Sequence, residues 1–172
     1  MATPTTLPAT FVAGNVLTAA QMNNLRGAFR VLQIVQATKA NTFSTTSSTY
    51  VDVTDLSVTI TPSATSSTIL VFMSVQTAAT TGDAVVRVVR GATAIAVGTG
   101  GSGYNGTGMA SSSYPNAMFT VGTTFNDSPA TTSATTYKVQ MQANSGTAVV
   151  NRRGFDTAYG GFSSITVMEI SA

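Results

Sequence analysis

Residues 43–76, FSTTSSTYVDVTDLSVTITPSATSSTILVFMSVQ, carry the densest β-strand signal in the chain. Within 56–60, apolar and polar residues alternate, which is the period of a strand with one buried face. Residues 61–67 interrupt this pattern with proline, serine and threonine, as a turn does. Residues 69–75 then form a nearly continuous apolar run, which fits a strand buried on both faces. The stretch predicts two strong strands joined by a polar turn.

Strand signals continue on both sides of this stretch, and turn residues separate them at regular intervals. A tight turn at 144–146 predicts a hairpin between 136–143 and 147–151, and 123–125 is expected to extend a hairpin from 117–121. This spacing, with little helix, predicts a mainly β fold: an antiparallel β-sandwich or jelly roll of about 8–10 strands. The other predicted strands are 32–38, 50–53, 56–61, 68–76, 84–90, 92–97 and 164–170.

The N-terminal part reads differently from the rest, so residues 1–31 are expected to form an arm and a short helix, with the β-sandwich head at 32–172. Thr18 and Gln21 fit a capping box at the start of this helix. The helix stripe is predicted to serve anchoring or oligomerisation, with packing on its own sandwich as the alternative. The residues proposed for this surface are Leu17, Met22, Leu25 and Phe29, and Leu32 continues the same spacing.

Charged residues make up only 8% of the 172 residues, whereas hydrophobic residues make up 43%. Ordinary soluble domains carry about 25% charged residues, and a surface with so few charges protects a monomer poorly from association. The composition therefore predicts a homo-oligomer. A coat domain kept in solution by its hydroxyl groups alone is the alternative.

Several classes of partner and cofactor are not expected from the residue inventory. The eight Lys and Arg residues form no dense run, so a nucleic-acid footprint is not predicted. No apolar run approaches the ~20 residues that span a bilayer. The chain has no Cys and no His, which removes disulfides, thiolate metal sites and the usual zinc ligand sets. No metal and no cofactor are predicted.

Catalytic residues are not predicted either. Without histidine, the many serines lack the usual general base. A carboxylate pair for glycoside hydrolysis, or a calcium site, would have to draw on acidic residues that turn chemistry explains as well. These residues are Asp52, Asp55, Asp83, Asp127, Asp156 and Glu169.

Two loops are the candidate recognition sites. Residues 98–103, GTGGSG, match G-x-G-x-x-G, but more loop follows instead of a helix, so a flexible surface loop is expected and not a dinucleotide site. Its adherent residues Tyr104, Asn105, Met109 and Tyr114 suit a saccharide or a protein surface, with a solvated connector as the alternative. Arg152 and Arg153 suit a salt bridge between subunits or an acidic surface, with a solvated loop as the alternative.

Residues 14–25, GNVLTAAQMNNL, resemble the short N-terminal segment of many tailed-phage virion proteins, with the pattern G-x-V-x-T-A-A-x-x-N. Residues 50–53 (YVDV), 60–63 (ITPS) and 66–71 (SSTILV) resemble the β-head of phage tail-fibre-like and structural proteins. Thr68 stands where those proteins usually have lysine.

Residues 165–170, ITVMEI, resemble the last strand of the same proteins. The resemblance covers roughly the first 76 residues and the last ten, and it leaves the middle of the chain unmatched. It implies a virion surface protein, often a homotrimer, with a sandwich resembling the C1q/TNF jelly roll. It implies no catalytic residue.

The resulting hypothesis is a non-enzymatic bacteriophage virion protein on the particle surface. It would be a homotrimeric tail-fibre tip or a capsid-decoration protein, attached through its N-terminal arm to other virion proteins. A carbohydrate-binding β-sandwich module that attaches to a host-surface glycan is the alternative, although the absence of Trp weighs against it. An enzyme ranks third.

Overall fold

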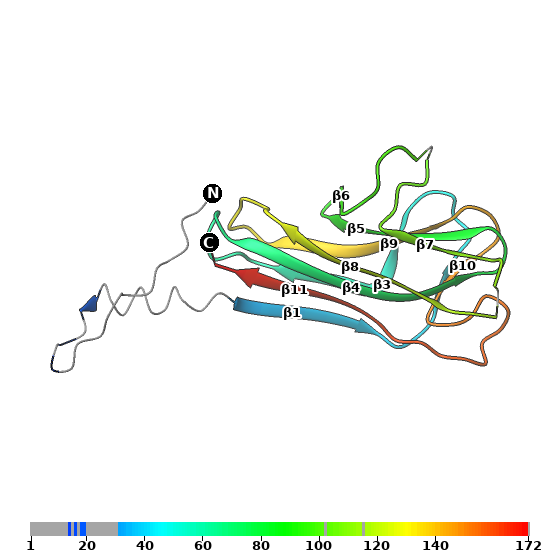
Figure 1. Cartoon of the computed structure of the whole chain (residues 1–172), viewed down its shortest axis with the longest axis horizontal. Coiled ribbons are helices and arrows are strands. Elements are labelled where there is room, and N and C mark those ends of the chain that lie inside the picture. Colours follow the sequence, from blue (N-terminus) through cyan, green and yellow to red (C-terminus); the bar gives the residue numbers. More distant parts are fainter. Residues whose placement is uncertain are drawn as a thin grey trace.

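The computed structural model describes residues 31–101, 103–114 and 116–171, together with residues 14, 16, 18 and 19. In this part of the chain, eleven strands form two antiparallel sheets packed face to face (Figure 1), which confirms the predicted antiparallel β-sandwich. The strands are β1 (Val31–Lys39), β2 (Phe43–Thr45), β3 (Val51–Ile60), β4 (Thr68–Ala79), β5 (Asp83–Arg90), β6 (Thr93–Ile95), β7 (Gly108–Ser111), β8 (Phe119–Asp127), β9 (Thr135–Ala143), β10 (Ala148–Val150) and β11 (Ser163–Ile170). The short strands β2 and β7 were not predicted, because neither carries an alternating pattern.

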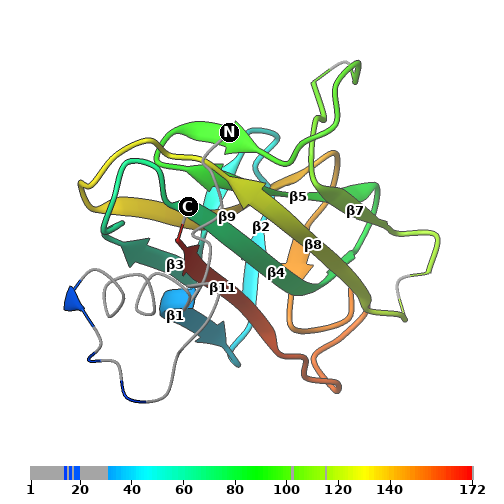
Figure 2. The same ribbon diagram turned by 60° about the vertical axis from the view of Figure 1, so that its left-hand side comes forward.

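Strands that follow one another in the chain often belong to different sheets. Sheet A has the order β1-β11-β4-β10-β2, with β8 on the other edge of β4; sheet B has the order β3-β9-β5-β6, with β7 also pairing β5. Figure 2 shows β8, β4, β11 and β1 side by side. Consecutive long strands therefore lie mostly in opposite sheets, since the chain crosses between the sheets after β2, β3, β4, β7, β8 and β9.

This alternation makes the predicted hairpins wrong. The strands on either side of the 144–146 turn do not pair, because β9 belongs to sheet B and β10 to sheet A. The turn at 61–67 likewise carries the chain from β3 in sheet B to β4 in sheet A. Residues 119–127 form the single strand β8 along β4, and no hairpin forms within them. Each of these turns spans the sandwich, so that both flanking strands bury one face against the other sheet.

The hydrophobic core lies between the sheets and contains one face of each long strand. Leu56, Val58 and Ile60 of β3 are buried there, as their alternation predicted. In β4, Ile69 and Val71 are buried, whereas Phe72 points outward and is 38% exposed. The expectation that 69–75 is buried on both faces is therefore wrong in the single chain, whose outer sheet A face keeps apolar residues in contact with solvent.

A buried carboxylate anchors the 61–67 turn to the last strand. Glu169 of β11 is fully buried, and one of its oxygens accepts hydrogen bonds from Ser63 N (2.7 Å), Ser63 Oγ (2.6 Å) and Ser67 Oγ (2.7 Å). The other oxygen accepts a hydrogen bond from Gln33 Nε2 (2.6 Å) of β1. Burial by itself raises the pKa of Glu169, but these hydrogen bonds outweigh burial and lower the pKa to about 2. The carboxylate thus ties β1, β11 and the crossing turn together.

A second buried carboxylate joins the sheets at Asp127, the last residue of β8. Arg90 Nη1 of sheet B donates to both Asp127 oxygens at 2.7 and 2.8 Å, and the Tyr137 hydroxyl donates at 2.6 Å. Burial and this carboxylate raise the pKa of Tyr137 far above its ordinary value. Asp127 was expected to be a turn residue; the structure instead places it in a strand, where it links the two sheets.

The sandwich has two distinct ends. The start of β1 and the end of β11 lie at one end, whereas the segments 112–118 and 151–162 lie at the other (Figure 1). The 96–107 loop projects beside sheet B in the half of the molecule that carries those segments (Figure 1). The sandwich therefore begins and ends opposite the segments 112–114, 116–118 and 151–162.

The Glu169 cluster predicts a pH-dependent stability. Because a carboxylate accepts all four hydrogen bonds and an amide cannot, Glu169→Gln is expected to lower the free energy of unfolding by about 2–3 kcal/mol at neutral pH. The pKa is lower in the folded state, so this stabilisation is complete above the ordinary pKa near 4.5 and is lost as pH falls towards 2. Urea unfolding of both proteins between pH 7 and pH 2 measures the difference. A gap that stays constant across this range would contradict the assignment.

Candidate functional site

The structure separates the predicted recognition residues into two groups. Tyr104 and Asn105 lie in the loop between β6 and β7, and Met109 lies in β7 itself, paired with β5 of sheet B. Tyr114, Arg152 and Arg153 lie in the end segments opposite the start of β1 (Figure 1). These residues therefore do not form one continuous surface.

The loop at 98–107 is tied to sheet B, although its sequence predicted a flexible segment. The Tyr50 hydroxyl donates to the backbone oxygen of Asn105 (2.8 Å), and Gln142 Nε2 donates to that of Gly103 (3.3 Å). Thr107 N donates to Val86 O of β5 at 2.8 Å. A Cβ atom on Gly106 would lie 2.4 Å from a methyl group of Val85, so glycine permits this close approach. Gly106 thus serves packing, and the Tyr104 ring remains 43% exposed.

A group of polar side chains lies on sheet B near this loop, and of them the sequence singled out only Asp52, as a candidate carboxylate. The Arg87 guanidinium stacks 3.7 Å from the centre of the Tyr50 ring and donates twice to Gln140 Oε1. Gln140 and Lys138 both donate to the Asp52 carboxylate. These hydrogen bonds, chiefly the one from Lys138, hold the pKa of Asp52 below its usual range. Burial raises the pKa of Tyr50, while Arg87 opposes this shift. Only the pairing of β3, β9 and β5 brings these residues together, so no local pattern could have found them.

The second group centres on Arg153. Its guanidinium donates to both oxygens of Asp156, at 2.6 and 2.5 Å, and lies 4.2 Å from the centre of the Tyr159 ring. The Arg153 hydrogen bonds, aided by Ala158 N, lower the pKa of Asp156 to about 2. Arg152 instead donates to the backbone oxygen of Arg153 at 3.2 Å. Arg153 and Tyr159 line an open hollow of about 270 Å³, whose other lining residues are Asn116 and Met118.

Exposed aromatic rings gather in the same end segments. Phe155, Tyr159 and Phe162 are 72%, 58% and 58% exposed within eight residues of one loop. Tyr114 is 68% exposed, and its ring packs edge-on against Phe119 with 6.4 Å between ring centres. Of these rings, only Tyr114 was predicted. The sequence signal for the others was the density of aromatic residues at 155–162 beside Arg153.

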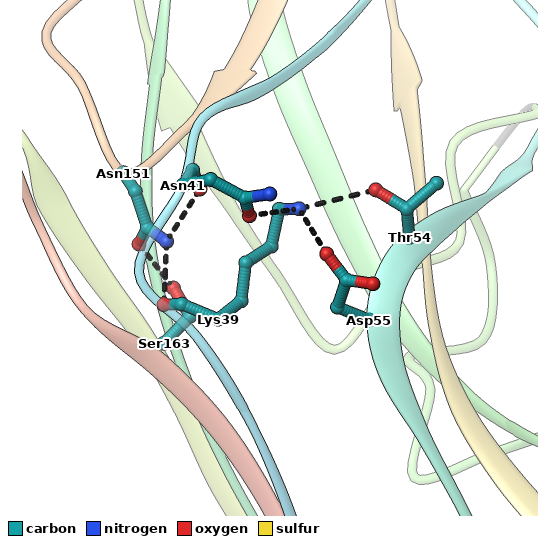
Figure 3. A network of polar contacts seen from close by, with 6 residues as sticks. All are labelled: Lys39, Asn41, Thr54, Asp55, Asn151 and Ser163. Atoms are coloured by element: carbon teal, nitrogen blue, oxygen red, sulfur yellow. Dashed lines mark hydrogen bonds and ion pairs between the residues drawn. The ribbon is translucent and has the colours of Figure 1, made fainter.

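A network at the base of this loop holds the two sheets together (Figure 3). The Lys39 side chain, fully buried at the end of β1, donates to Asn41 Oδ1 (2.7 Å), Thr54 Oγ1 (3.1 Å) and Asp55 Oδ2 (3.2 Å). An ammonium has three N–H groups, so all of its donors are used. Asp55 has a φ of 67° at an irregularity in the pairing of β3 with β9, and this backbone turns its carboxylate towards Lys39. Lys39 is therefore a structural link between β1 and β3.

Asn151, fully buried with a φ of 60°, forms the other half of this network (Figure 3). Its Nδ2 donates to the backbone oxygens of Lys39 (2.8 Å) and Asn41 (3.1 Å), and its Oδ1 accepts from Ser163 Oγ (2.6 Å). One amide thus fixes the position where the exposed loop leaves β10 and where β11 begins.

Within the described residues, no three acidic side chains come close enough to hold a metal ion. In the same part of the chain, no helix is long and apolar enough to cross a membrane. The proposed anchoring residues Leu17, Met22, Leu25 and Phe29 lie outside the described residues, whereas Leu32, which continued their spacing, belongs to β1. No protein-family model matches the sequence, and no curated protein shows significant similarity to it.

The Asn151 network predicts a measurable difference between two substitutions. Asn151→Ala removes three hydrogen bonds and places a Cβ-bearing residue without a polar side chain at positive φ, so a loss of about 3 kcal/mol or more is expected. Asn151→Gly removes the same bonds but tolerates the backbone, so its loss should be smaller by about 1 kcal/mol. Urea unfolding measures both. Equal stabilities would show that the backbone conformation at this position does not contribute.

Proposed function

We propose that the protein is a non-enzymatic structural component of a bacteriophage virion, displayed on the particle surface as a homo-oligomer. A trimer is the expected state, and the N-terminal arm is the expected attachment to other virion proteins. Tail-fibre tip and capsid decoration are the two forms of this role.

The observation that carries the proposal is the polarity of the sandwich. The sandwich begins at β1 and ends at β11 on one end, and the segments that carry Tyr114, Phe155, Tyr159 and Phe162 lie at the other (Figure 1). A protein attached through the segment before β1 would present these rings away from its support. Loops on a rigid β scaffold are common positions for contacts with partners.

The resemblance to phage virion proteins adds the biological setting. Its separate phrases come together in space, because Ser63 and Ser67 from residues 60–71 hydrogen-bond Glu169 from residues 165–170. Two short phrases that are about 100 residues apart in the chain thus form one contact cluster. Such a cluster is a reason for the phrases to occur together in one fold.

Copy number in purified particles tests the proposal. Quantitative mass spectrometry of phage particles made by the producing strain is expected to find the chain at a fixed ratio to the major capsid protein. Hundreds of copies would assign decoration, and a few copies would assign the tail. Removal of the chain by a high-salt wash, or its absence from particles that still infect, would contradict a structural role.

A carbohydrate-binding module is the second candidate, and the hollow beside Arg153 favours it. A saccharide is held by ring faces together with planar polar groups, and this hollow offers Tyr159, Arg153 and Asn116. Its open form suits a chain of sugars more than a small buried ligand.

Loss of one ring tests this candidate. On an array of bacterial lipopolysaccharides and capsular polysaccharides, Tyr159→Ala is expected to weaken binding at least about tenfold, because the stacking surface is lost. Phe155→Ala is the matched control, since Phe155 is also an exposed ring of this loop but does not line the hollow. No bound glycan, or equal effects of the two substitutions, would count against the module.

A further inference from the structure

The outer face of sheet A is apolar and carries no charge. Along β1, β11, β4 and β8, side chains at odd-numbered positions include the core residues, so those at even-numbered positions point outward. All the outward residues on these four strands are uncharged. The large apolar ones are Leu32, Ile34, Leu70, Phe72, Met168 and Ile170, of which Leu32, Ile34 and Phe72 are 43%, 56% and 38% exposed.

Strand pairing makes these residues contiguous. Ile34 lies opposite Met168, and Met168 lies opposite Leu70, so one apolar row crosses three strands. Neighbouring side chains across strands are close enough to form one surface. In β1 the inward row begins with Gln33 and ends with Lys39, while the outward row begins with Leu32 and Ile34. This edge strand thus carries large apolar side chains on the side that the chain's own core does not cover.

A hollow lies beside this row. It has a volume of about 520 Å³, and Phe72, Ser74, Gly122, Thr124 and Ser164 line it. Gly122 of β8 has no side chain where its neighbours on the face do. The face therefore combines a projecting apolar row with an adjacent recess, as an interface that receives side chains does.

We infer that a second copy of this chain covers the outer face of sheet A. Because this face carries no charge, it can be buried against the same face of neighbouring copies, whether two or three copies meet, without leaving a charge unpaired. Four strands about 4.8 Å apart and eight residues at about 3.3 Å rise cover roughly 500 Å² per copy. Both copies together bury roughly 1,000 Å², which is the lower limit for a specific interface.

The other sheet does not offer this surface. Outward residues of sheet B include Asp52, Arg87 and Lys138, and the 98–107 loop is hydrogen-bonded over part of that face. The uncharged surface expected from a chain with only 8% charged residues is therefore the outer face of sheet A. The inference names the contact surface of the proposed homo-oligomer. It rests on the proposal that the chain assembles with itself, but not on the proposal that it belongs to a virion.

Charge insertion into the full-length chain tests the inference. By sedimentation velocity, the wild type is expected to be an oligomer, and Ile34→Glu or Phe72→Glu is expected to raise the dissociation constant at least about 100-fold. Ser57→Glu is the matched control, because Ser57 is an exposed strand residue on the outer face of sheet B, paired with Lys138. The control should remain oligomeric, and circular dichroism should show the same β spectrum for all variants.

A substitution without charge gives a second measurement. Gly122→Leu would fill the hollow, and its Cβ would lie 3.3 Å from Met73 O, a contact that a small shift relieves. It is expected to weaken association at least about tenfold if the recess receives a side chain. An unchanged oligomer in Ile34→Glu and Phe72→Glu would overturn the inference. A monomeric wild type would also overturn it. Absence from phage particles with the oligomer intact would instead contradict only the proposed function.

Discussion

The crossing between the sheets depends on one buried carboxylate. The 61–67 turn carries the chain over the end of the sandwich, where Ser67 is buried and the donors that reach inward need acceptors within the protein. Glu169 provides them, since its two oxygens accept from Ser63, Ser67 and Gln33. A charge buried here is tolerable only because these donors replace its water shell, and the depressed pKa is the sign that they do. β3 and β4 can then face each other across the core without pairing.

The sequence predicted most strands because alternation is a local property, but pairing is not. Residues 136–143 and 147–151 carry good strand patterns around a tight turn, yet β9 and β10 lie in different sheets. What decides their partners is burial: β10 completes sheet A beside Thr77, Ala78 and Ala79 of β4, which is distant in sequence. The sequence could not predict the partners of the buried polar residues Lys39, Asp127 and Asn151 either. Each is satisfied by atoms from other strands, and single residues carry no signal of such partners.

The candidate sites were predictable only in part for the same reason. Arg153 and Tyr114 were visible as a charged pair and an aromatic residue in loops, and both do lie at the exposed end. Tyr159 and Asn116 join Arg153 only through folding, as does Arg87 with Tyr50. In the G-x-G-x-x-G match, Gly100 and Gly103 have a φ of 95° with no atom within 4 Å of a Cβ position, so they serve the backbone conformation. Gly106, outside the match, lets the loop lie close to β5. A glycine-rich segment alone does not distinguish close approach to a ligand from close approach to the chain's own sheet.

The distribution of charge connects the fold with the proposed assembly. Of the ion pairs in the described residues, two close the sandwich ends, at Lys39 and Arg90, one lies on sheet B and one lies in the 151–162 loop. None lies on the outer face of sheet A. The few charged residues are thus spread unevenly, because the outer face of sheet A has none. The same face carries the apolar row of β1, β11 and β4. A single chain gains nothing from that arrangement, because exposed leucine, isoleucine and phenylalanine on a sheet promote association. The arrangement is favourable when another copy covers the face.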